Sequence, residues 1–300
     1  MNTVGTALLL IITGTLAACG YNVQVVKDFH DGASDLSKSY NDILTLTEKW
    51  CAESMLYKEL NSAGQYKNSE TTTNNIKTEC KKYADSVKVG RASSVVLMTY
   101  TDSLASLVDI SPQYLSNDIK GVTDALGTIK NTNGDGRFKA GELDAFNKLA
   151  SVMAEMVTSA AIKDKATEIM YEHTQTINEQ VDLMRKIGRD AYEKTEWLND
   201  VSRKNLVNSL ERVGKMQQGD TSDQAITYRY LAYIVYQDTH DEKKSKAVLD
   251  AFDKAAEDFK TANSDLSVRF AKLSKKEKLD SVKALVDKAK ELKEAVNNIK

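Results

Sequence analysis

The sequence predicts an all-α protein, folded as an elongated bundle of seven to eight long, coiled-coil-like helices. The 300-residue chain has one proline and 14 glycines, whereas strand-rich folds need many turns built from these two residue types. Apolar side chains recur at steps of three and four residues along most of the chain, which is the period of one buried helix face. No stretch alternates apolar and polar residues as a half-buried strand does.

The first expected helix covers about residues 26–57 and has a near-heptad apolar stripe. Gly32 lowers the helix propensity locally, which favours a start nearer Ser34. Residues 34–300 are expected to form one elongated bundle domain, with residues 19–33 as a tether and the start of this helix. The inward positions are Val26, Phe29, Ala33, Leu36, Tyr40, Ile43, Thr47, Trp50, Ser54 and Tyr57.

The second expected helix covers residues 76–108 and ends before Ser111 and Pro112. Serine there can cap a third helix over 112–130, and proline suits its first position because no N–H is needed there. Residues 92–110 carry few charges, but two aspartates favour a central bundle helix over a membrane span. The inward positions are Ile76, Cys80, Tyr83, Val87, Gly90, Ser94, Leu97, Thr101, Leu104 and Val108.

A helix over about 143–157 is followed by the longest apolar stripe in the chain. This stripe starts near Ile162, ends near "MQQGD" and predicts a helix of more than 50 residues, or roughly 75 Å. The boundary between the two helices, near 158–164, stays open. The inward positions are Ala166, Ile169, His173, Ile177, Gln180, Met184, Ile187, Ala191, Leu198 and Val201.

Three capping-box patterns precede the last expected helices, each a Ser or Thr followed three residues later by Glu or Gln. The pairs are Thr221 with Gln224, Thr239 with Glu242, and Ser274 with Glu277. The first pair precedes "AITYRYLAYIVYQ", where four tyrosines crowd one helix. Burial in the bundle and an aromatic partner-binding patch are the two interpretations of that segment. The inward positions of the last two helices are Val248, Phe252, Ala255, Phe259, Ala262, Leu279, Val282, Val286, Ala289, Leu292 and Val296.

Residues 1–18 have the features of a signal peptide. Their uncharged apolar core has the length of a signal-peptide core and is short for a membrane span. The sequence "LAAC" at 16–19 resembles the lipobox of bacterial lipoproteins. This resemblance covers residues 1–19 only and implies cleavage before Cys19, a diacylglyceryl chain on its thiol and, with Gly20 next, sorting to the outer membrane. The start lacks the usual Lys or Arg, and the alternative is an uncleaved N-terminal anchor.

Two further cysteines, Cys51 and Cys80, lie in helical segments on either side of a polar loop. A helical hairpin would bring them level, and an even number of cysteines outside the cytoplasm suggests a disulfide. Two free thiols are the alternative. A zinc site has little support, because no second Cys or His lies at ligand spacing.

The stretch "NTNGDGRFKAGE" matches the EF-hand pattern at every position but the first. Asn131, Asn133 and Asp135 take positions 1, 3 and 5, Arg137 offers its carbonyl at position 7, and Glu142 chelates at position 12. The stretch also resembles the calcium loops of dockerin-like modules. Because only two ligands carry charge, we expect weak, structural Ca²⁺ binding, at best about 10⁻⁴–10⁻³ M. The alternative is a turn closed by its own Asx side chains.

Composition and motifs exclude several functions. The net charge is −2, from 41 basic and 43 acidic residues, so no broad basic field exists to bind nucleic acid. The common hydrolase, metalloprotease and nucleotide-binding motifs do not occur, and we expect no enzymatic activity. His173 fits a buried core histidine, His30 has no evident partner, and the "DTHDEKK" segment reads as a turn and helix cap rather than a metal cluster.

These features predict a lipid-anchored envelope protein with a binding or scaffolding role, one form of which is an exclusion factor of phage or plasmid origin. Its partners would be the membrane, through the lipid, and an unidentified envelope or extracellular protein. The alternative is a membrane-active protein, loosely similar to helical pore-forming toxins, that opens to expose the less charged residues 92–162.

Overall fold

The computed structural model describes residues 23–62, 69–108, 162–216, 242–273 and 278–299. Every regular element in these ranges is a helix, in agreement with the all-α prediction. The elements are α1 (Val23–Ser62), α2 (Ser69–Val108), α5 (Ile162–Met216), α7 (Glu242–Arg269), the short 3₁₀ helix η3 (Phe270–Lys272) and α8 (Asp280–Asn297). The helices expected at 112–130, 143–157 and 224–236 lie outside the described residues, so their number stays a prediction.

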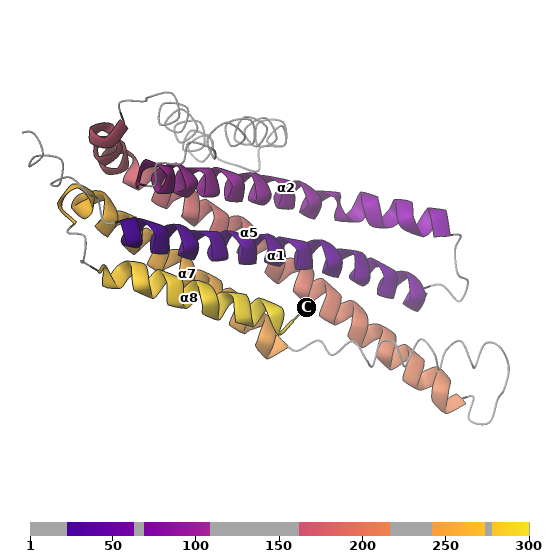
Figure 1. Ribbon diagram of the computed structural model, residues 1–300. Helices are drawn as coiled ribbons and strands as arrows, with labels where there is room; N and C mark the ends of the chain where they lie inside the picture. The colour runs from indigo at the N-terminus through magenta and orange to yellow at the C-terminus, as the bar shows by residue number, and fades with distance from the viewer. Residues whose placement is uncertain (1–22, 63–68, 109–161, 217–241, 274–277, 300) are drawn as a thin grey trace, which may run out of the picture.

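Helix α1 lies at the centre of the described bundle (Figure 1). It packs against α2, α5 and α8 and also contacts α7. Helices α1, α5 and α8 run in one direction, and α2 and α7 run in the other. This central position explains why α1 buries its whole predicted stripe and also Val25, Leu44 and Leu46, since neighbours cover more than one of its faces.

The bundle has two parts along its length. Near the start of α1, all five long helices pack together. Farther along, α1, α2 and α5 continue beyond α7 and α8 (Figure 1). We call this second part the three-helix extension and define it as residues 51–62 of α1, 69–80 of α2 and 193–216 of α5. Leu198 and Val201 of α5 lie there and are only half-buried, although their stripe is fully buried from Ile177 to Ala191.

The long helix expected from Ile162 to the "MQQGD" sequence is confirmed as α5, with 55 residues. Helix α1, in contrast, begins at Val23 rather than near Ser34 and continues through Gly32. The glycine allows close packing, because a Cβ there would lie 2.8 Å from Leu285 Cγ of α8. The expectation of a later start was wrong because helix propensity ignores this contact.

Several inward positions carry hydroxyl groups that bond within their own helices. Thr47 donates to the carbonyl of Ile43 at 3.0 Å, and Ser93 donates to that of Val89 at 2.8 Å. Such bonds to the preceding turn remove the cost of burying a hydroxyl without a partner on another helix. Small polar residues can therefore occupy the α1–α2 contact.

A few polar bonds cross between helices inside the core. The Tyr100 hydroxyl of α2 donates to Asn263 Oδ1 of α7 at 2.9 Å, and the Asn263 amide donates to Asn178 Oδ1 of α5 at 3.1 Å. Because each buried group loses a partner if one helix slides, this chain of bonds fixes the register of three helices.

The expected start of the last helix was wrong. Helix α8 begins at Asp280, with Leu279 at its N-cap position and no side-chain cap bond, rather than after a cap at Ser274. Val286 was expected to face inward but is half-buried, and its neighbour Leu285 is fully buried instead. Buried Leu273 and Leu279 hold the chain before α8 against the core, so packing rather than a capping box determines where the helix begins.

The less charged part of α2 belongs to the core. Val96, Leu97, Tyr100 and Leu104 are buried there. No helix in the described part of the chain combines the length and the apolar composition that a bilayer crossing requires. Over the described residues 92–108, this agrees with the reading of segment 92–110 as a bundle helix.

Candidate functional site

The three-helix extension contains a disulfide between two of its helices. Cys51 of α1 and Cys80 of α2 are joined, with Cα atoms 5.9 Å apart and 29 positions apart in sequence. The α1–α2 hairpin brings them level, as the sequence predicts. Cys51 is fully buried, whereas Cys80 is half-buried. The bond therefore links the two helices where α7 and α8 no longer support them.

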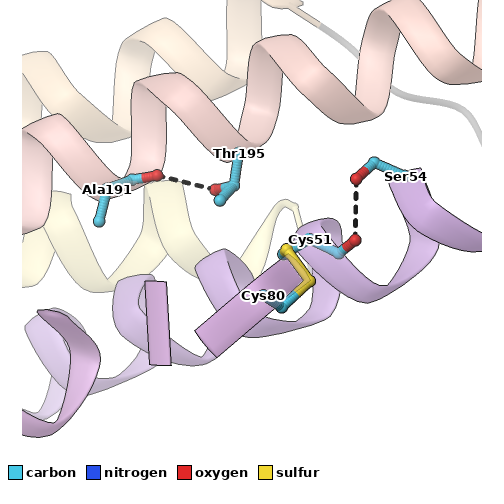
Figure 2. The surroundings of a disulfide bond; sticks show 5 residues. All are labelled: Cys51, Ser54, Cys80, Ala191 and Thr195. Carbon is cyan, nitrogen blue, oxygen red and sulfur yellow. Dashed lines mark hydrogen bonds between the residues drawn. A yellow bond between two sulfur atoms is a disulfide. The ribbon is translucent and has the colours of Figure 1, made fainter. Parts of the chain in front are cut away.

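Helix α5 completes the surroundings of this disulfide (Figure 2). The Thr195 hydroxyl donates to the carbonyl of Ala191 at 2.9 Å, and the Ser54 hydroxyl donates to that of Cys51 at 2.8 Å. The two hydroxyl groups beside the disulfide are therefore satisfied within their own helices.

An aromatic pair marks the base of the extension. Trp50 of α1 and Tyr192 of α5 meet edge to face, with ring centroids 4.7 Å apart and planes at 62°. Burial raises the pKa of the Tyr192 hydroxyl, so that group stays neutral. This pair anchors α5 to α1 directly beside the disulfide.

The surface of the extension exposes two large apolar side chains. Trp197 of α5 is 61% exposed, and Leu56 of α1 is 38% exposed. Tryptophan is rarely left in solvent and is enriched at the centres of protein interfaces. The face of α5 around Trp197 is therefore a candidate contact surface.

An open pocket of about 330 Å³ lies between α1 and α2, close to the disulfide. Its lining is formed by Met55, Lys58, Glu59, Asn75, Ile76, Thr78 and Glu79. The Asn75 amide donates to Glu59 Oε1 at 3.0 Å, and the lining combines charged side chains of both signs with the apolar Met55 and Ile76. Such a pocket suits contact with a polar partner better than enclosure of a small molecule.

His30 forms a polar contact at the opposite end of the bundle. Its Nε2 atom lies 2.6 Å from Asp102 Oδ1 of α2, and its Nδ1 atom lies 3.3 Å from Asp31 Oδ1. The pKa of His30 is raised, chiefly by the hydrogen bond to Asp102 and against the effect of burial. The expectation that His30 has no partner was wrong, because the two residues are 72 positions apart in sequence and only the α1–α2 packing joins them.

An ion-pair cluster between α5 and α7 also went unrecognised. Arg185 contacts Asp253 and Glu257, and Lys260 contacts Asp182 at 2.8 Å. The three- and four-residue spacing of these charges indicates a charged face on each helix. It does not indicate which two helices meet through these faces. Half-exposed pairs of this kind align helices and add little stability.

The other predicted site residues lie outside the described ranges. These are Cys19, the loop residues Asn131, Asn133, Asp135, Arg137 and Glu142, and the tyrosines of 224–236. His173 lies on α5 and is half-buried rather than fully buried. Within the described part of the chain, no cluster of His, Cys, Asp or Glu side chains is arranged to hold a metal ion.

Comparison with protein-family models, curated proteins and solved structures finds no match to this chain. The functional argument therefore depends on the residues and their geometry alone.

Proposed function

We propose that this chain is a lipid-anchored protein of the bacterial cell envelope with a binding or scaffolding role. Its bundle would be held by a lipid on Cys19, at the outer membrane rather than the inner one. The observation that carries this proposal is the "LAAC" sequence at 16–19 followed by a disulfide-bonded domain. Disulfides persist in oxidising compartments, and export by a lipoprotein signal leads to one.

The three-helix extension is the part that we assign to binding. It lies at the end of the bundle farther from the start of α1 at Val23 (Figure 1). It carries the exposed Trp197 and the open pocket beside Cys80, and the disulfide stiffens it. A stiff surface loses less entropy on binding. We further propose that the remaining expected helices complete the bundle and that the loop 131–142 binds Ca²⁺ weakly, in a structural role.

Metabolic labelling with palmitate tests the anchor. The wild-type chain should carry the label, while Cys19→Ala should remain unlabelled and unprocessed. Cys51→Ala/Cys80→Ala is the matched control, because it also removes cysteines but should keep the label. An unlabelled wild-type chain would refute the lipoprotein assignment.

Site-specific photo-crosslinking in the native envelope tests the binding surface. A crosslinker at position 197 should give a discrete adduct. The same crosslinker at Lys254, an exposed position on α7, should give none. Equal adducts at both positions, or none at either, would argue against a binding role for this face.

The membrane-active alternative has one supporting observation. Buried hydroxyl groups of α2 bond their own helix, among them Ser93 and Ser103, so they would keep these bonds if α2 moved away from its neighbours. The Cys51–Cys80 disulfide and the contact of His30 with Asp102 join α2 to α1 and would oppose this movement. Release of dye from vesicles incubated with the protein tests this alternative. Dye release would favour membrane activity, and vesicles that retain their dye would favour the binding role.

A further inference from the structure

The end of the bundle nearest Val23 contains a basic corner. Among the described residues between positions 269 and 283, four are basic and one is acidic, although the whole protein has a net charge of −2. This segment joins α7 to α8. Phe270, Leu273 and Leu279 are buried and hold it against the core. The exposed basic residues of this corner are Arg269, Lys272, Lys278 and Lys283.

Contacts between helices place this corner level with the start of α1. Phe29 of α1 packs on Phe259 of α7, with ring centroids 5.1 Å apart. Gly32 of α1 lies against Leu285 of α8. Because α7 runs against α1 and α8 runs along it, the end of α7 and the start of α8 lie toward the Val23 end of α1. Figure 1 shows the end of α7 and the start of α8 at the same end as the start of α1.

Large apolar side chains are also exposed at this end. Val268 is 64% exposed and Tyr171 of α5 is 69% exposed, the two highest values among large apolar residues in the described ranges, and Val23 is 37% exposed. The 3.1 Å bond between Asn178 of α5 and Ser264 of α7 shows that Tyr171 and Val268 lie toward the same end. Basic residues beside exposed aromatic and aliphatic ones are typical of surfaces that rest on a bilayer.

Acidic groups lie on both sides of this end. On α7 and α8, Asp265 and Asp280 are exposed, and the four exposed basic residues of the corner outnumber them. Asp31 and Asp102 surround His30 at the α1–α2 contact, and Glu168 and Glu172 are exposed on α5. The end is therefore polarised, with the positive charge concentrated on the side of α7 and α8. An anionic surface would attract that side and not the α1–α2 side.

We propose that the basic α7–α8 corner docks on anionic phospholipid headgroups of the membrane that holds the anchor, so that the three-helix extension points away from the bilayer. This inference rests on the lipid anchor proposed above. Val23 is four positions after Cys19 in the sequence, and a chain spans at most about 3.6 Å per residue. Val23 is therefore at most about 14 Å from Cys19. The corner lies at the same end of the bundle as Val23, so the anchor keeps it near the bilayer. Near an anionic surface each basic residue contributes about a fivefold gain in binding.

Lysine acylation of the processed, lipidated chain in vesicles tests the orientation. In vesicles of phosphatidylcholine with phosphatidylglycerol, labelling of Lys272 and Lys278 should fall several-fold relative to Lys58 and Lys194, which are exposed in the extension. The difference should disappear in phosphatidylcholine alone and in high salt, because salt screens exposed charges. Equal labelling of all four lysines in anionic vesicles would overturn the proposal.

A matched pair of variants separates docking from simple charge. Lys272→Glu/Lys278→Glu should abolish the protection of Lys283, whereas Lys58→Glu/Lys194→Glu changes the charge equally and should retain it. Protection of Lys283 that survives in both would contradict docking through this corner. Vesicle flotation is read in parallel, since a chain that does not float refutes the anchor, while one that floats with unprotected lysines refutes only the docking.

Discussion

The ring of Tyr40 on α1 stacks on the ring of Phe252 on α7, with centroids 5.2 Å apart and planes 18° apart. Two glycines make this position possible. A Cβ at Gly90 of α2 would lie 2.7 Å from the Tyr40 hydroxyl, and a Cβ at Gly188 of α5 would lie 2.7 Å from Tyr40 Cε2. One side chain of the central helix therefore meets α2, α5 and α7 at the same level.

Alanine at either glycine should destabilise the bundle. We expect Gly90→Ala and Gly188→Ala each to lower the free energy of unfolding by roughly 1–3 kcal/mol, because the added methyl group overpacks the core. Tyr40→Phe removes the hydroxyl, so it should recover part of the Gly90→Ala loss and none of the Gly188→Ala loss. Urea unfolding of the single and double variants measures this, and equal recovery in both would contradict the contacts described.

The pair of His30 and Asp102 should make stability depend on pH. The pKa of His30 is raised above its ordinary value of 6.5 in the folded protein, so folding favours the protonated ring. This contribution is fully present below pH 6.5, the unfolded value, and is lost as the pH rises through the raised folded value. The melting temperature should therefore fall over that interval in the wild type.

Variants identify the group responsible for this pH dependence. His30→Gln should flatten the fall, and Asp102→Asn should reduce it, since the hydrogen bond to Asp102 is the main cause of the raised pKa. His173→Gln is the control, and its melting temperature should depend on pH as that of the wild type does. A slope that persists in His30→Gln would assign the effect to another residue.

Loss of the disulfide should loosen one end of the protein. Cys51→Ala/Cys80→Ala should lower the free energy of unfolding by about 3–4 kcal/mol in the chain-entropy model for a loop of this size. Hydrogen exchange should rise in residues 51–62 and 69–80, while amides around Leu36 keep their protection. A uniform rise along α1 would show that the extension does not unfold separately.

The loop 131–142 should link stability to calcium if it binds the ion. At a calcium concentration ten times the dissociation constant, binding to the native state alone contributes about 1.4 kcal/mol. Glu142→Gln should weaken this effect far more than Lys139→Gln, and Asn131→Asp should strengthen it by adding a carboxylate. Coincident melting curves in calcium and in chelator, for wild type and Asn131→Asp alike, would leave the stretch as a turn.

The sequence by itself determined the helical class, most of the buried positions and the disulfide partners. The α1 stripe from Val26 to Tyr57 and the end of α5 near Met216 follow from a local period, which each helix expresses whatever its neighbours are. The pairing of Cys51 with Cys80 follows from the even number of remaining cysteines outside the cytoplasm and from the hairpin, because short connections place consecutive helices side by side.

Only the tertiary structure decided which faces meet and how each contact is made. It put α1 at the centre, joined His30 to Asp102, placed Gly32 against Leu285 and began α8 at Asp280. Two helices with similar stripes can pack in many pairings and registers. The pairing found depends on groups far apart in sequence, such as Tyr100 and Asn263, whose complementarity appears only when the helices come together.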